Sequence, residues 1–401
     1  MSDNNCNYIL FDDLSRDRLM PFTFIRPVAE IRLGILTIRE KWEMWLHATT
    51  SALTKDYLQE KYPLVEGALN VLINGAITPN ADLVGEIEAL KPGETLVKDS
   101  LLIAVCLDKS ELGDFDYTVP AGFVQKQALS GFLRINRPWH LFNYNGQELI
   151  SDYELVTAGR ISAPISSTNN LLRPDRIFAE EGAKLEYTTL NASTGPIYLG
   201  RNTEIMEGAL IRGPFALCEG AIVKMGAKIY GPTTMGPFSK VGGEVTNSIL
   251  FAYSNKVHEG YMGNSALGEW CNIGADSNTS NLKNNYTRVK VWDYVTGRAE
   301  DTGLQFCGLM MGDYSKCGIN TMFNTGTVVG ISSNIYGAGF PGNFIPSFSW
   351  GGAAGFETYR VDKSFETIEK AMMSRNLTLS ETDRRIIASV FKVTDRYRKS
   401  I

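Results

Sequence analysis

The chain has 401 residues, of which 44% are hydrophobic and 10% aromatic, and this predicts a folded protein with more than one compact core. A formal net charge of −5 argues against a nucleic-acid partner, because nucleic-acid binding normally requires a basic face. The apolar runs are too short to span a bilayer and the polar start lacks a signal-peptide core, so we expect a cytoplasmic protein without a membrane partner.

Residues 1–165 are predicted to form a truncated α/β domain with a Rossmann-like order of elements. Residues 28–46 carry apolar side chains at helical spacing, so we expect one helix there. A further helix is expected to open at Arg137-Pro138-Trp139 and to lead out of the domain. The runs typical of buried strands are Tyr8–Phe11, Asn70–Asn74 and Leu101–Leu107.

Residues 166–355 carry a different signal, an aliphatic residue or Met at every sixth position. Neither an α-helix nor a simple strand alternation produces this period, whereas a hexapeptide β-helix does, because three short strands make one triangular coil. We therefore expect a left-handed parallel β-helix with an inserted hairpin at about 286–306. Residues 356–401 are expected to form a helical tail that covers its open end. The repeated positions are Leu199, Ile205, Ile211, Leu217, Val223, Ile229, Met235 and Val241, followed by Met311, Cys317, Phe323, Val329 and Ile335.

One histidine, His258, lies in a distinctive setting within this repeat. Tyr261 follows three residues later, then Leu267-Gly268 and the run Asn272-Ile273-Gly274-Ala275. These residue types and intervals resemble the acetyltransferase motif of bifunctional GlmU-type enzymes, which make UDP-N-acetylglucosamine. A Gly-rich coil alone does not prescribe His, Tyr and Asn at these places.

The resemblance implies a role for each matched position. His258 would be the general base that takes a proton from the amino group of the sugar, a task that suits imidazole because it titrates near neutral pH. Lys228 stands in place of a family Arg, and Arg212 and Lys256 are candidates for a second family cation that has no obvious counterpart here. The implied substrate contacts are Tyr261, Asn272, Glu244, Lys228 and Lys256, and the implied acetyl-CoA contacts are Ala275 and Asn281.

The N-terminal half resembles sugar nucleotidylyltransferases less closely. The run from Arg18 to Thr23 preserves one part of their motif, but residues 12–17 lack the glycines that cradle a triphosphate, and Pro27-Val28 replaces Pro-Lys. The tentative nucleotide contacts are Arg18, Thr23 and Arg26. Asp12 and Asp13 are weak candidates for Mg²⁺ ligands, and two solvated turn carboxylates explain them equally well.

The sequence thus favours acetyl-CoA-dependent N-acetylation of an amino-sugar 1-phosphate such as glucosamine-1-phosphate, alone or coupled to nucleotidyl transfer. One alternative is a sugar-1-phosphate uridylyl- or thymidylyltransferase with a structural β-helix. Another is a non-catalytic regulatory subunit of a sugar-nucleotide enzyme. We also expect a homotrimer, because the flat faces of triangular solenoids can pack around a threefold axis.

Overall fold

The computed structural model describes residues 6–399, which fall into two compact units. Unit 1 comprises the chain up to Leu19, Ile25–Ile31 and Leu36–Asn136. Unit 2 comprises Met20–Phe24, Arg32–Ile35 and the chain from Arg137 onward. The polar segment before Cys6, on which the signal-peptide expectation rests, lies outside the described residues. Among the described helices, none has the length and apolar character needed to cross a membrane.

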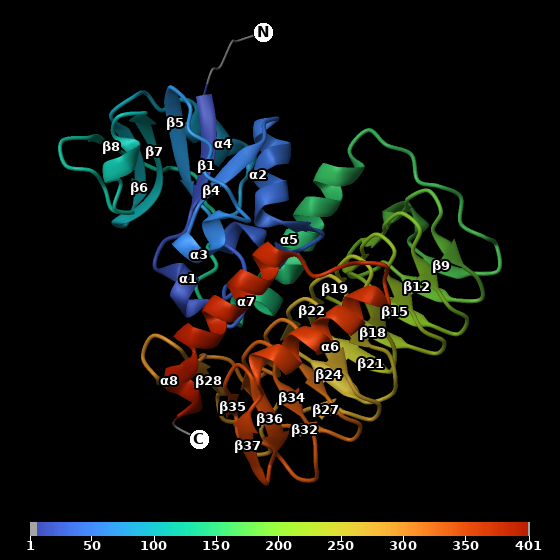
Figure 1. The fold of residues 1–401 in the computed structure, drawn as a ribbon. Coiled ribbons are helices and arrows are strands. Elements are labelled where there is room, and N and C mark those ends of the chain that lie inside the picture. Colours follow the sequence, from blue (N-terminus) through green and yellow to red (C-terminus); the bar gives the residue numbers. More distant parts are fainter. Residues whose placement is uncertain (1–5, 400–401) are drawn as a thin grey trace. The chain divides into compact units, whose positions relative to one another are not determined.

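Unit 1 is built on a six-stranded sheet of order β4-β1-β5-β7-β6-β8 (Figure 1). Strand β1 pairs in parallel with β4 and β5, β7 runs antiparallel between β5 and β6, and β8 pairs in parallel with β6. The three predicted strands are confirmed as β1, β5 and β7, and they carry buried side chains because both faces of the sheet are covered. The strands are β1 (Cys6–Phe11), β4 (Thr50–Leu53), β5 (Leu69–Asn74), β6 (Glu94–Lys98), β7 (Leu101–Asp108) and β8 (Val124–Gln127). The helical segments of unit 1 are α1 (Ser15–Arg18), η1 (Val28–Glu30), α2 (Ile38–Leu46), α3 (Asp56–Gln59), α4 (Ala81–Glu88) and η2 (Leu112–Asp114).

The prediction of one helix over 28–46 is wrong in its first half. The short strands β2 (Arg32–Leu33) and β3 (Leu36–Thr37) interrupt it, and Gly34 has φ +79°, which a helix cannot accommodate. Helix α2 begins after Thr37, whose hydroxyl accepts from the Glu40 amide at 3.1 Å while the Glu40 carboxylate accepts from the Thr37 amide. This capping box satisfies amides at the start of α2, so the helix starts there rather than at residue 28.

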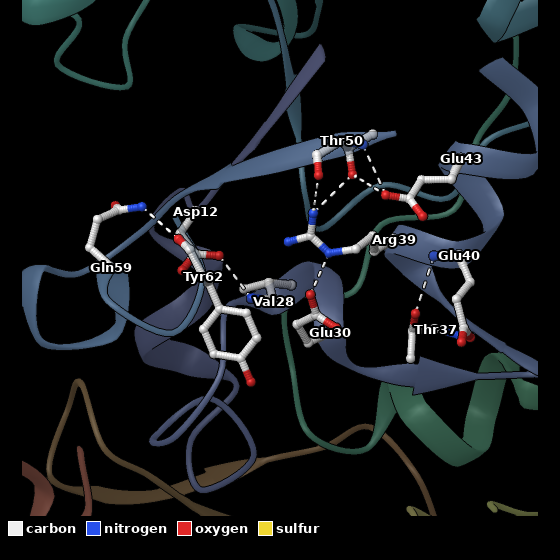
Figure 2. A network of polar contacts seen from close by, with 10 residues as sticks. All are labelled: Asp12, Val28, Glu30, Thr37, Arg39, Glu40, Glu43, Thr50, Gln59 and Tyr62. Atoms are coloured by element: carbon white, nitrogen blue, oxygen red, sulfur yellow. Dashed lines mark hydrogen bonds and ion pairs between the residues drawn. The ribbon is translucent and has the colours of Figure 1, made fainter. Parts of the chain in front are cut away.

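A polar network joins α2 to its neighbours in unit 1 (Figure 2). The guanidinium of Arg39 donates to the carbonyl and hydroxyl of Thr50, each at 2.9 Å, and pairs with the carboxylate of Glu30. Glu43 accepts in turn from the amide of Thr50 at 2.9 Å. These contacts fasten the edge strand β4 to α2, so the end of the sheet is held by side chains as well as by strand pairing.

Unit 2 contains the predicted β-helix, whose coils contribute one strand to each of three sheets (Figure 1). The strands within each sheet pair in parallel from coil to coil, except that the last strand of one sheet, β37 (Gly355–Thr358), runs antiparallel to β36 (Ser349–Gly352). Each sheet is named here by its first strand. Every member of the six-residue series is buried, which confirms that this series forms the interior of the solenoid.

The β9 sheet holds β9 (Asn170–Leu172), β12 (Thr189–Asn191), β15 (Leu210–Arg212), β18 (Lys228–Tyr230), β21 (Glu244–Thr246), β24 (Tyr261–Gly263), β27 (Asn278–Thr279) and β32 (Met322–Phe323). The β10 sheet holds β10 (Ile177–Ala179), β13 (Ile197–Leu199), β16 (Phe215–Leu217), β19 (Thr233–Met235), β22 (Ile249–Leu250), β25 (Ala266–Leu267), β30 (Met310–Met311), β33 (Val328–Val329) and β35 (Phe344–Ile345). The β11 sheet holds β11 (Lys184–Leu185), β14 (Glu204–Ile205), β17 (Ile222–Val223), β20 (Lys240–Val241), β23 (Asn255–Lys256), β26 (Asn272–Ile273), β31 (Lys316–Cys317), β34 (Asn334–Ile335), β36 (Ser349–Gly352) and β37 (Gly355–Thr358). The short 3-10 helix η3 (Pro174–Arg176) precedes β10.

Other elements of unit 2 pack on this solenoid. Helix α5 (His140–Thr157) is tied to β19 by the hydroxyl of Thr234, which donates to Asn145 at 3.1 Å. The antiparallel strands β28 (Lys290–Asp293) and β29 (Arg298–Asp301) form a hairpin between two coils. At the far end, Phe348 makes an edge-to-face contact with Phe391, with ring centroids 5.0 Å apart. The C-terminal helices are α6 (Val361–Met373), α7 (Glu381–Val393) and α8 (Asp395–Arg398).

Candidate active sites

Three of the predicted substrate contacts form a row on the outer face of the β9 sheet. Lys228 pairs in register with Glu244, and Glu244 pairs with Tyr261 on the next coil. Paired positions in neighbouring strands lie about 4.8 Å apart. The parallel register therefore places a cation, a carboxylate and a phenol side by side, with the buried interior behind them.

His258 lies at one end of this row, in the corner 257–260 between β23 and β24. Its side chain is exposed. The corner of the next coil stacks on it, because the amide of Asp276 donates to the carbonyl of Glu259 at 3.0 Å. This stacking places Ala275 one coil from His258, and Asn272 lies exposed on β26 just before the same corner. Lys228 reaches toward this corner, with its Nζ 3.9 Å from a carboxylate oxygen of Glu259.

Tyr261 is held by contacts that fix its hydroxyl. Nδ2 of Asn281 donates to that hydroxyl at 2.9 Å and to Oδ1 of Asn264 at 2.8 Å. Burial raises the pKa of Tyr261, and the carboxylate of Glu244 acts in the same direction. Gly263 leaves room for this pair, since a Cβ there would lie 2.2 Å from the Tyr261 hydroxyl. The structure thus brings the predicted residues Tyr261 and Asn281 into direct contact.

Lys256 has a different position from the other predicted substrate contacts. It points into the interior of the solenoid, is 1% exposed, and its Nζ donates to the carbonyl of His258 at 2.5 Å. Burial lowers its pKa to about 8, although the carboxylates of Glu259 and Asp276 favour the charged form. Lys256 therefore does not lie on the outer face where Glu244 and Tyr261 meet solvent.

Unit 1 contains a separate cavity of about 400 Å³ at the carboxyl ends of β1, β4 and β5. Ligands of open α/β sheets commonly bind at this edge. Carboxylates, cations and hydroxyls are mixed along the wall, and Tyr117 is 41% exposed there. The polar side chains that line it include Asp12, Asp13, Arg16, Thr54, Asn74, Asp116, Tyr117 and Arg134.

The two candidate metal ligands in this cavity already have partners within unit 1. Asp12 accepts from the Val28 amide at 2.8 Å and from the Thr54 hydroxyl at 2.5 Å, and burial raises the pKa of Asp12 to about 6. Asp13 accepts from Arg134 at 2.7 Å and from Asn74 at 2.9 Å. Within residues 6–399, no group of three or more His, Cys, Asp or Glu side chains is arranged to hold a metal. Each of the four carboxylate oxygens of Asp12 and Asp13 already accepts a hydrogen bond, so a Mg²⁺ ion would have to displace these contacts, and the pair as arranged does not fit a Mg²⁺ site.

The tentative nucleotide contacts do not gather at the cavity. Thr23 is 0% exposed and Arg26 is 3% exposed, and neither they nor Arg18 are among the described residues that line it. Sequence reasoning missed Asn74 and Arg134. The position of Asn74 at the end of a predicted buried strand was an available signal, whereas no sequence signal marked Arg134.

These observations define a class of protein: an α/β unit with a polar cavity at its strand ends, followed by a hexapeptide β-helix with a polar row that has a histidine at one end. Residues 8–161 match the sugar nucleotidyl transferase family. Over 87 residues the chain is 37% identical to the bifunctional protein GlmU of Methanocaldococcus jannaschii, a match that covers 22% of this chain and 21% of that protein. Over 144 residues it is 26% identical to the bifunctional sugar-1-phosphate nucleotidylyltransferase/acetyltransferase of Sulfurisphaera tokodaii, with 35% of each chain covered. The resemblance to the GlmU-type family is thereby confirmed, and the chain spans about a fifth to a third of the length of these curated relatives.

Solved structures of two acyltransferases also align with part of the chain. The polySia-specific acetyltransferase NeuO is 14% identical, with 57% of this chain and 95% of that chain covered and a TM-score of 0.27. The UDP-N-acetylglucosamine acyltransferase of Arabidopsis is 13% identical, with 59% and 92% covered and a TM-score of 0.23.

Proposed function

We propose that this protein transfers an acetyl group from acetyl-CoA to the amino group of an amino-sugar 1-phosphate, with glucosamine-1-phosphate as the expected acceptor. The observation that carries this proposal is the row of Lys228, Glu244 and Tyr261 with the exposed His258 at its end. Cation, carboxylate and phenol suit a ligand that carries phosphate, amine and hydroxyl groups together.

The chemistry assigns each group a task. The sugar amine must lose a proton before its nitrogen can attack the thioester carbonyl, and His258 accepts that proton. The new C–N bond forms as the C–S bond breaks, and the proton then passes to the departing thiolate of CoA. Lys228 would bind the phosphate as a point charge, while Glu244 and Tyr261 orient the sugar.

We further propose that the working form is a homotrimer. The outer face of one solenoid is convex, whereas small ligands are normally bound in concave pockets. A second solenoid packed against this face would supply the concavity, and Ala275 and Asn281 would contact acetyl-CoA there. The three sheets of the solenoid provide flat faces on which such packing can occur.

The cavity of unit 1 supports a second candidate activity, nucleotidyl transfer to a sugar 1-phosphate. Its place at the strand ends and the family match over residues 8–161 favour this activity. Arg134, Arg16 and Lys55 line the cavity and could bind phosphate oxygens, although four aspartates share the wall. A divalent ion would need other ligands, or Asp12 and Asp13 would have to give up their present hydrogen bonds.

Two assays run side by side on the intact protein test these proposals. Release of CoA from acetyl-CoA plus glucosamine-1-phosphate is measured with a thiol reagent, and release of pyrophosphate from UTP or dTTP plus the sugar phosphate with a coupled phosphate assay. CoA release alone supports the acetyltransferase, and both products support a bifunctional enzyme. Pyrophosphate release alone would make the solenoid structural, and neither product would indicate a regulatory subunit.

A further inference from the structure

The interior of the β11 sheet contains one departure from its apolar pattern. One inward side chain from each coil forms a column, and strand register fixes its members. Lys256 is the only charged residue among the described members of this column, and it is 1% exposed. The column runs Leu185, Ile205, Val223, Val241, Lys256, Ile273, Cys317 and Ile335.

The amine of Lys256 has one specific contact in this interior. Its Nζ lies 2.5 Å from the main-chain carbonyl oxygen of His258. The preceding coil leaves room for this contact, because Gly243 has no Cβ: one added there would lie 2.8 Å from Nζ and 2.7 Å from the His258 carbonyl oxygen. The titratable groups around the amine are Glu259, Asp276, Cys317 and Lys228.

A lysine at this place works against folding. The other coils fill the column with aliphatic side chains or Cys, and a buried amine has to be desolvated. Replacing a buried charged group with an apolar residue of similar volume is often neutral or stabilising. Core packing therefore does not explain an amine at residue 256. The hydrogen bond from this amine to the main chain of His258, the proposed general base, does explain it.

We propose that Lys256 is a positioning residue for acetyl transfer, which fixes the main chain of His258 and hence the place of its imidazole. The inference rests on the function proposed above. His258 lies in an exposed corner, and a carbonyl anchored to the buried amine restricts how that corner can move. Such restriction matters because a displacement of about 1 Å at a reacting group can lower a rate about 10²-fold.

The test compares Lys256→Met with wild type in the CoA-release assay. Met fills the column without the amine, so we expect a thermal midpoint at least as high as that of wild type and a kcat lower by about 10- to 100-fold, with KM for acetyl-CoA within twofold. Lys256→Gln, which keeps a donor, should recover part of the rate. Val241→Met alters the same column one coil away and serves as the control, with a kcat near wild type.

A double variant separates positioning from a general structural role. The double variant with His258→Ala and Lys256→Met should have the same residual activity as His258→Ala alone, because the amine of Lys256 acts through His258. A Lys256→Met enzyme with near wild-type kcat would overturn the proposal. So would a parallel loss of thermal midpoint and rate, or fully additive losses in the double variant. If wild type itself releases no CoA with any amino-sugar phosphate, it is the proposed function that fails.

Discussion

The two candidate sites are assembled in different ways. In the solenoid, Lys228, Glu244 and Tyr261 come from consecutive coils, and strand register alone superposes them. In unit 1, Asp13 and Arg134 lie far apart in the chain and meet through an ion pair of 2.7 Å, with Asn74 bound to the same carboxylate.

Because of this difference, side chains of the solenoid site can be replaced with little effect on folding stability, whereas side chains of the unit 1 cavity contribute to stability as well as to ligand binding. The outer side chains of the solenoid stand on a core that they do not help to form, so one of them can be lost while the fold persists. The cavity residues of unit 1 bond to each other, so their removal should disturb both ligand binding and folding. The following changes test this contrast, from the largest expected effect to the smallest.

The first change, His258→Ala, should remove most acetyl transfer without altering stability. Loss of a general base typically lowers a rate by about 10²–10⁴-fold, and the exposed imidazole contributes little burial. CoA release and the thermal midpoint are the measurements. Met225→Ala is the control, since Met225 is 66% exposed at the corresponding corner two coils earlier. Near wild-type turnover by His258→Ala would contradict the base assignment.

The second change, Lys256→Met, should alter stability in a pH-dependent way. Burial lowers the pKa of Lys256 from 10.5 to about 8, so between these values the unfolded chain binds more protons than the folded one. The stability of wild type should therefore rise relative to the variant as pH increases from 8 to 10.5. The advantage of the variant, at most about 3 kcal/mol below pH 8, should fade over this range. Urea unfolding at pH 7 and pH 10 measures it, and a constant difference would argue against a buried charged amine.

The third change, Asp13→Ala, should destabilise unit 1 by about 2 kcal/mol, because it leaves Arg134 and Asn74 without their shared acceptor. Asp17→Ala is the matched control: Asp17 lines the same cavity, but its side chain is 42% exposed, so its pair with Arg16 should be worth less than about 1 kcal/mol. Urea unfolding followed by hydrogen exchange in β1 and β5 gives the readout. Equal losses for both variants would mean that the cavity is not built on Asp13.

The fourth change, Asn281→Ala, should have the smallest effect. It removes one hydrogen bond to the Tyr261 hydroxyl, worth about 1 kcal/mol, so KM for a substrate should rise about fivefold while the fold is unchanged. Ser280→Ala, the exposed neighbour, is the control. An unchanged KM for both acetyl-CoA and the sugar phosphate would remove Asn281 from the proposed site.

The same contrast, between strand register and long-range contacts, decides how much of each site can be predicted from the sequence. A repeated coil converts sequence spacing into spatial position, so the inward series follows from the six-residue period. The outer row does not, because Lys228, Glu244 and Tyr261 are 16 and 17 residues apart, and only the family resemblance pointed to these residues. The inward position of Lys256 was not predicted, because its coil is shorter than three hexapeptides. Counting in sixes from Val241 leads to Glu259, whereas Lys256 is the residue in register with Val241.

In unit 1, the buried strands follow from their apolar runs, but the residues between them depend on tertiary contacts. The expected helix over 28–46 begins at Ile38 because the positive φ of Gly34 and the Thr37 cap override the apolar spacing. Arg134 lies in a loop, and no local sequence pattern predicts that this loop brings it to Asp13.

The hairpin of β28 and β29 has a consequence for chain length. Residues 280–309 separate β27 from β30, yet β30 pairs with β25 in the register that an uninterrupted coil would have. The entropy of closing a flexible loop grows only logarithmically, by about 0.6 kcal/mol for each doubling of its length. Insertions or deletions at this junction should therefore be tolerated, and the excursion could lengthen or shrink among relatives while the coils carrying His258 and Tyr261 keep their stacking.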